Sequence, residues 1–74
     1  MNNTTSVSGN ELNIGDTIYV QGYDWVIDVI HAPTIADNRW GFKCHWSGQG
    51  VNPCFHNDDF STAQRADLKW VRKG

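Results

Sequence analysis

The stretch that decides the fold is Arg39-Trp40-Gly41-Phe42-Lys43-Cys44-His45-Trp46. Apolar side chains occupy every second position, and polar or small residues fill the positions between them. Because successive side chains of a strand point to opposite faces of a sheet, this alternation predicts a half-buried β-strand. Its apolar face is expected to be core, and it consists of Trp40, Phe42, Cys44 and Trp46.

Two shorter runs before this stretch have the same period of two. In residues 17–21, Ile18 and Val20 share one face, while Tyr19 lies on the other. Residues 25–31 carry apolar groups on both faces, which is typical of a central or curled strand. Gly22 lies between the two runs and can adopt a positive φ, so the sequence predicts a tight connection there. A surface loop over residues 32–38 follows.

The C-terminal part is expected to contain two more strands and a helical turn. Residues 51–56 can return as a fourth strand, which Pro53 restricts to the edge of a sheet. Ser61-Thr62-Ala63-Gln64 matches a capping box and predicts a short helical turn after Ser61, ending near Leu68. Residues 69–71 follow as a last short strand.

The length of 74 residues allows one domain, which we expect to span residues 11–74. Residues 1–10 are almost entirely Asn, Thr, Ser and Gly, so we expect them to form a flexible N-terminal tail. The first residues have neither a basic nor an apolar segment of the kind found in signal peptides. No apolar run is long enough to span a membrane. These features and the two cysteines predict a cytoplasmic protein with reduced thiols.

Together these elements predict an all-β fold: a small barrel of about five antiparallel strands, with one short helical turn before the last strand. The chain resembles the SH3-like barrel superfamily over roughly residues 12–72. The resemblance is carried by Ile14-Gly15-Asp16, by Trp25-x-Ile27-x-x-Ile30 and by Ala66-Asp67-Leu68-x-x-Val71. The resemblance is at the level of the fold, and it implies no active site. What it implies is a groove between loops, of the kind that receives proline-rich segments or cationic side chains in small SH3-like domains.

Cysteine and histidine residues raise the question of a metal or catalytic site. Cys44, His45, Cys54 and His56 fall within thirteen residues, as zinc ligands can. Because Cys44 and His45 are adjacent on a strand, their side chains point to opposite faces, and we expect Cys44 to pack as an apolar residue. Cys54 and His56 have no recognisable third catalytic group. We therefore expect neither a metal, nor a cofactor, nor enzymatic activity.

One enzymatic alternative is a site formed between subunits. Some plasmid-borne reductases resemble this chain in size and fold and build one pore from four copies. Their Val-Gln-Ile-Tyr motif is absent, and Tyr19-Val20-Gln21-Gly22 resembles it only superficially.

Exposed aromatic residues favour an interaction module that binds a protein partner or a second copy of the chain. The aromatic residues exceed what so small a core can hide, and Tyr19, Tyr23 and Trp25 are the candidate contact residues. No membrane association is expected.

Nucleic-acid binding is the alternative function. Four of the six basic residues lie in the last ten residues, and the candidate contacts are Lys43, Arg65, Lys69 and Arg72. The formal net charge of −2 gives no overall electrostatic support for this function.

Overall fold

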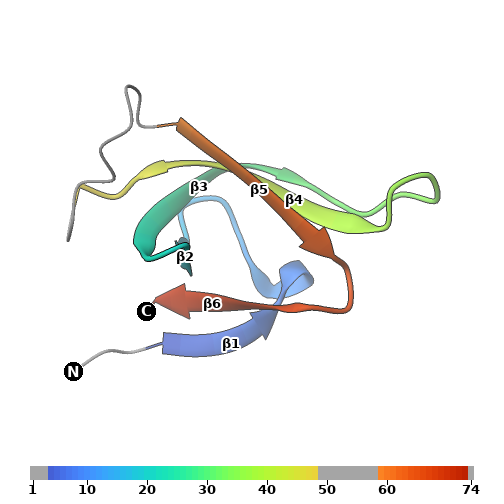
Figure 1. The fold of residues 1–74 in the computed structure, drawn as a ribbon, viewed down its shortest axis with the longest axis horizontal. Helices are drawn as coiled ribbons and strands as arrows, with labels where there is room; N and C mark the ends of the chain where they lie inside the picture. Colours follow the sequence, from blue (N-terminus) through green and yellow to red (C-terminus); the bar gives the residue numbers. More distant parts are fainter. Residues whose placement is uncertain (1–3, 49–58, 74) are drawn as a thin grey trace.

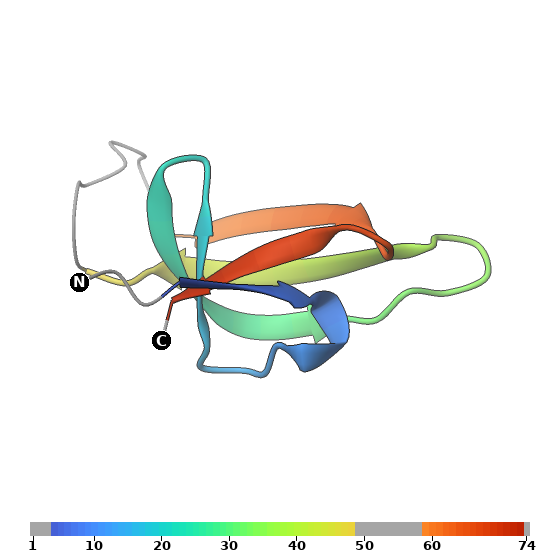
Figure 2. The ribbon, with the colours of Figure 1, turned by 90° about the horizontal axis from the view of Figure 1, so that it is seen from below.

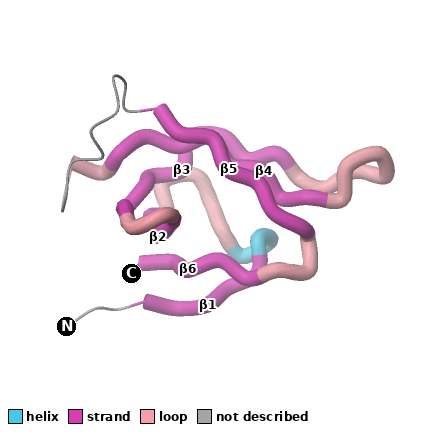
Figure 3. The backbone as a smooth tube through the Cα atoms, viewed as in Figure 1, coloured by secondary structure: helices cyan, strands magenta, loops and turns pink. Residues whose placement is uncertain are grey.

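The computed structural model describes residues 4–48 and 59–73, and it is all-β. Six strands form one antiparallel sheet in the order β1-β6-β2-β3-β4-β5 (Figure 1). In the described part, the single helical segment is one 3₁₀ turn, η1, so that no helix there could cross a membrane (Figure 3). The elements are β1 (Thr4–Ser8), η1 (Gly9–Glu11), β2 (Thr17–Val20), β3 (Tyr23–His31), β4 (Arg39–Trp46), β5 (Asp59–Arg65) and β6 (Lys69–Lys73).

The sheet curls so that its two ends lie on opposite sides of the core. In Figure 1, β4 and β5 run along the upper side, β6 and β1 along the lower side, and β2 and β3 connect them. The curl coincides with a bulge in β3 between Ile27 and Val29, where the register against β4 shifts. Before the bulge Ile27 points inward, whereas after it Ile30 pairs with the buried Phe42 and Val29 is exposed. This bulge explains why residues 25–31 have apolar groups on both faces.

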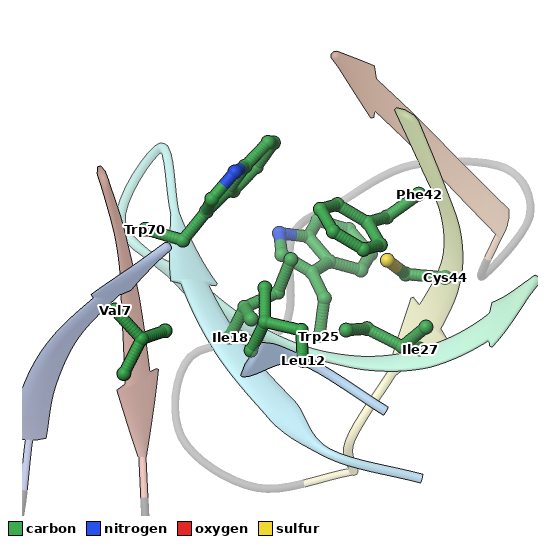
Figure 4. Packing of buried hydrophobic residues seen from close by; sticks show 8 residues of the cluster. All are labelled: Val7, Leu12, Ile18, Trp25, Ile27, Phe42, Cys44 and Trp70. Atoms are coloured by element: carbon green, nitrogen blue, oxygen red, sulfur yellow. The ribbon is translucent and has the colours of Figure 1, made fainter. Parts of the chain in front are cut away.

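Eight buried side chains form the core, with Trp25 in their midst (Figure 4). The Trp25 ring stacks on Phe60 at a centroid distance of 4.3 Å, and its Nε1–H donates to the Val20 carbonyl oxygen at 3.2 Å. Of the predicted apolar face of β4, Phe42 and Cys44 are fully buried, while Trp40 and Trp46 are partly buried and pack against the core. The buried hydrophobic residues are Val7, Leu12, Ile18, Trp25, Ile27, Phe42, Cys44 and Trp70.

The N-terminal segment corrects the expectation of a flexible tail over residues 1–10. Residues 4–8 form β1, which pairs antiparallel with β6 and places Val7 beside Trp70 in the core. Residues 9–11 form η1, where the Ser8 backbone N–H donates to Glu11 Oε2 at 2.9 Å. A polar segment is thus ordered by a backbone ladder and one buried side chain. Residues 1–3 lie outside the described residues.

The expected helical turn after Ser61 is also wrong, because Ser61 lies inside β5. Phe60, Thr62 and Gln64 are half-buried, while the residues between them are exposed, which is the period of a strand. The chain then reverses in a turn closed by a hydrogen bond of 3.0 Å from the Leu68 N–H to the Arg65 carbonyl oxygen. The strand expected over residues 51–56 lies outside the described residues. Two of the six described strands, β1 and β5, were not predicted from the sequence.

Candidate interaction surface

The three aromatic residues predicted as one contact patch lie on different faces of the β2–β3 hairpin. Tyr19 pairs with Asp24 on the outer face, and 46% of its surface is exposed. Tyr23 packs against the core and meets the Trp25 ring edge-on at 6.1 Å. Trp25 is 0% exposed, so its prediction as an exposed contact is wrong. Trp25 and Ile27 are two residues apart on one strand and so share a face, and this spacing indicates that Trp25 points into the core with Ile27.

The exposed ring of Tyr19 lies beside a charged pair. Lys73 Nζ lies 5.8 Å from the centroid of the ring, a cation–π distance. The same ammonium donates to Asp24 Oδ2 at 3.0 Å. The Asp24 and Lys73 side chains are only 17% and 32% exposed, so solvent screens this pair less than a surface ion pair. Tyr19 is therefore an exposed aromatic side chain with a fixed neighbour.

Val71 is an exposed apolar residue on the same sheet face as Tyr19. Strand β6 pairs with β2 through Thr17–Lys73 and Ile18–Arg72. Val71 lies two residues before Lys73 on the same side of β6, and it is 38% exposed. Figure 2 shows the turn of the β2–β3 hairpin standing clear of the other strands. We call Tyr19, Val71 and Lys73 the Tyr19 surface.

A second feature is a hollow on the outer face of β3, β4 and β5. Gly41 has no side chain, and it lies between His31 and Ala63 in one row across the three strands. The resulting hollow has a volume of about 370 Å³. Its polar lining includes His31, Asp37, Lys43 and Ser61. The hollow therefore presents one cationic group and one carboxylate group to any small polar side chain that enters it.

The basic residues proposed for nucleic-acid binding are divided among several faces. Lys43 borders the hollow on β4, and Arg65 lies on the outward side of β5 with its guanidinium bound to both Asp67 carboxylate oxygens at 3.1 and 2.8 Å. Lys69 Nζ donates to Ser8 Oγ at 3.0 Å. Arg72 pairs with the buried Ile18 and so occupies the inner face of β6, opposite to Lys69. The structure therefore places Lys43 and Arg65 on one face of the sheet, whereas Lys69 and Arg72 lie on opposite sides of β6.

Cys44 and His45 point to opposite faces of β4, as the sequence predicts. Cys44 is buried as a free thiol, and burial, followed by the charge of Asp28, raises its pKa to about 11. The His45 Nδ1 lies 2.8 and 2.9 Å from the two Asp28 carboxylate oxygens. Within residues 4–48 and 59–73 no three side chains of metal-binding type gather in one place. Cys54 and His56 lie outside the described residues.

Comparisons with protein-family models, with curated proteins and with solved structures found no match to this chain. The functional conclusion therefore depends on the geometry of its own surface. Sequence reasoning did not place Val71 and Lys73 on the same sheet face as Tyr19. The signal was the alternation in residues 69–73, where both residues lie on the opposite side from Trp70.

Proposed function

We propose that the chain is a non-catalytic interaction module that binds a protein partner through the Tyr19 surface. The observation that carries this proposal is the outward-facing Tyr19 ring, 46% exposed and flanked by Lys73. Tyr is enriched among residues that dominate binding energy, because it buries a large area at a small cost in side-chain entropy. The cation beside the ring and Val71 on the same sheet face add polar and apolar contacts for a partner.

We also propose that the fold is an SH3-like barrel with an added N-terminal strand. The consecutive antiparallel pairing of β2 to β5, with β6 returning beside β2, supports this assignment. The chain departs from the resemblance at residues 66–68, where a tight turn takes the place of a helical turn. A cytoplasmic, reducing location belongs to the same proposal, and the low content of two cysteines in 74 residues supports it.

Affinity capture from the native host with nuclease present tests the protein-binding function. The tagged wild-type chain is compared with Tyr19→Ala and with Ile14→Ala, which truncates another exposed apolar side chain. We expect a protein captured by wild type and Ile14→Ala to be at least tenfold depleted with Tyr19→Ala. Equal recovery with a folded Tyr19→Ala variant contradicts the proposal.

Nucleic-acid binding is a second candidate, favoured by one observation. In the part of the chain that the structure describes, Lys43 has no ion-pair partner, and it shares the outer sheet face with Arg39 and Arg65. Both arginines are paired with nearby aspartates, which weakens their attraction for phosphate. Single-stranded oligonucleotide binding that falls steeply with salt and is lost in Lys43→Glu would favour this candidate. Retention of partner protein after nuclease treatment favours the first.

A further inference from the structure

Among the strands that the structure describes, β5 lies at one edge of the sheet and has the properties of a pairing site. Among the described strands, it pairs with β4 alone, through an unbroken register from Arg39–Arg65 to His45–Asp59. A strand edge presents unpaired backbone N–H and C=O groups, and proteins usually protect it with Pro, Lys, a bulge or an inward-pointing charge. The seven residues DFSTAQR contain no Pro, Gly or Lys, and their charges stand only at the two ends.

We propose that β5 pairs antiparallel with β5 of a second copy of this chain, about a two-fold axis at Thr62. This inference goes beyond the proposed function, because it concerns another element of the sheet and another partner. The axis places Thr62 opposite itself, Ser61 opposite Ala63 and Phe60 opposite Gln64. It places Asp59 opposite Arg65 of the second copy at both ends. The interface is isologous and closes at two copies.

Charge complementarity selects this register over its neighbours. Directly opposed residues of an antiparallel pair lie on the same face of the sheet. A register therefore keeps the inner side of β5 inward in both copies only if it sets half-buried positions of one copy opposite half-buried positions of the other. An axis at Ser61 sets Asp59 opposite Ala63, and an axis at Ala63 sets Arg65 opposite Ser61. Of these three registers, only the axis at Thr62 sets the two opposite charges against each other.

The proposed pairing also sets a carboxylate beside two like charges of one copy. Arg65 lies directly across from Arg39 on β4, and like charges in that position repel, although each guanidinium is paired with an aspartate, Asp67 or Asp37. At the other end of β5, Asp59 lies across from His45. In the dimer, each end of the interface therefore has a row of Arg39, Arg65, then Asp59 and His45 of the second copy. The outward Ser61 and Ala63 between the ends are small and do not obstruct the approach.

Sedimentation velocity over a hundredfold range of concentration tests the dimer, with two charge reversals as probes. Asp59→Arg alone sets Arg opposite Arg at both ends, and Arg65→Asp alone sets Asp opposite Asp. A one-to-one mixture of the two variants restores an opposite-charge pair at each end. Lys43→Asp is the matched control, since it reverses a charge on the same outer face but one strand inward.

We expect wild type and Lys43→Asp to dimerise with increasing concentration, each reversal alone to weaken dimerisation at least tenfold, and the mixture to recover it. The Tyr19→Ala variant is expected to dimerise like wild type, so that failure here is distinct from failure of the proposed function. As a second measurement, amide exchange in β5 of wild type should slow as concentration rises. A wild-type chain that stays monomeric at about 1 mM overturns the proposal, because the dissociation constant of the dimer would then be weaker than about 1 mM. So does a dimer that neither reversal weakens, or a mixture that stays monomeric while both variants remain folded.

Discussion

Tyr19 and Tyr23 occupy opposite faces of one hairpin, although only three residues separate them in the sequence. Tyr19 pairs with Asp24, and the adjacent pair is Val20 with Tyr23. The first pair points outward beside Lys73, whereas the second packs against the core. Under the proposed function the two tyrosines therefore have separable roles, Tyr19 in partner binding and Tyr23 in the stability of the fold.

Removing each tyrosine should affect stability differently. Tyr23→Ala loses contacts with Trp25 and the core, and we expect it to lower the free energy of unfolding by about 2–3 kcal/mol. Tyr19→Ala loses an exposed cation–π contact, worth about 0.5–1 kcal/mol. Urea denaturation followed by Trp fluorescence measures both. Equal losses would show that Tyr19 is as much a part of the packed structure as Tyr23.

Gly9→Ala should destabilise the fold through Trp40. Gly9 is buried in η1, and a Cβ atom at this position would overlap the Trp40 indole ring. Overpacking of this kind costs about 1–3 kcal/mol. Asn10→Ala is the control, because Asn10 is exposed in the same turn. If the two variants have the same denaturation midpoint, η1 does not pack on Trp40 as described.

Val7→Ala tests whether the N-terminal strand belongs to the domain. Val7 is 3% exposed and lies opposite Trp70, so removal of its methyl groups should cost about 1–3 kcal/mol. Thr5→Ala, at an exposed position of β1, should change stability by less than about 0.5 kcal/mol. An unchanged midpoint in Val7→Ala would agree with a flexible tail instead.

The Cys44 thiol should make the fold sensitive to alkaline pH. Burial raises its pKa from 9.0 to about 11, so the folded chain holds this proton more tightly than the unfolded chain does. The resulting stability is fully present below pH 9 and is lost as pH rises toward 11. The difference in unfolding free energy between wild type and Cys44→Ala should therefore shrink over this interval. A constant difference would mean that the pKa of Cys44 is not raised in the folded chain.

Alternating hydrophobicity was sufficient to predict β2, β3 and β4, because each buries one face in the core. It failed at β1 and β5 for a common reason. Each strand contributes only one large apolar side chain, Val7 or Phe60, and its remaining positions are polar or small. Order there comes from backbone pairing with β6 or β4, and pairing partners leave no local signal in the sequence. At Ser61, a local capping pattern was outweighed by this pairing.

The candidate surface was predictable in part. Tyr19 follows from the alternation of residues 17–20, whereas its contact with Lys73 depends on the pairing of strands far apart in the sequence. The hollow at Gly41 likewise requires His31 and Ala63 from neighbouring strands. The inward position of Trp25 was predictable, because Trp25 shares a face of its strand with Ile27. The abundance of aromatic residues favoured an exposed position instead.

The most direct test of partner binding by the Tyr19 surface is a map of amide chemical shifts. The ¹⁵N-labelled chain is titrated with the protein obtained by affinity capture, and the shift change at each backbone amide is recorded. We predict the largest changes at Tyr19, Val71 and Lys73, with small changes at Gly41 and Lys43 beside the hollow. Large changes around the hollow with none at Tyr19 would contradict the account.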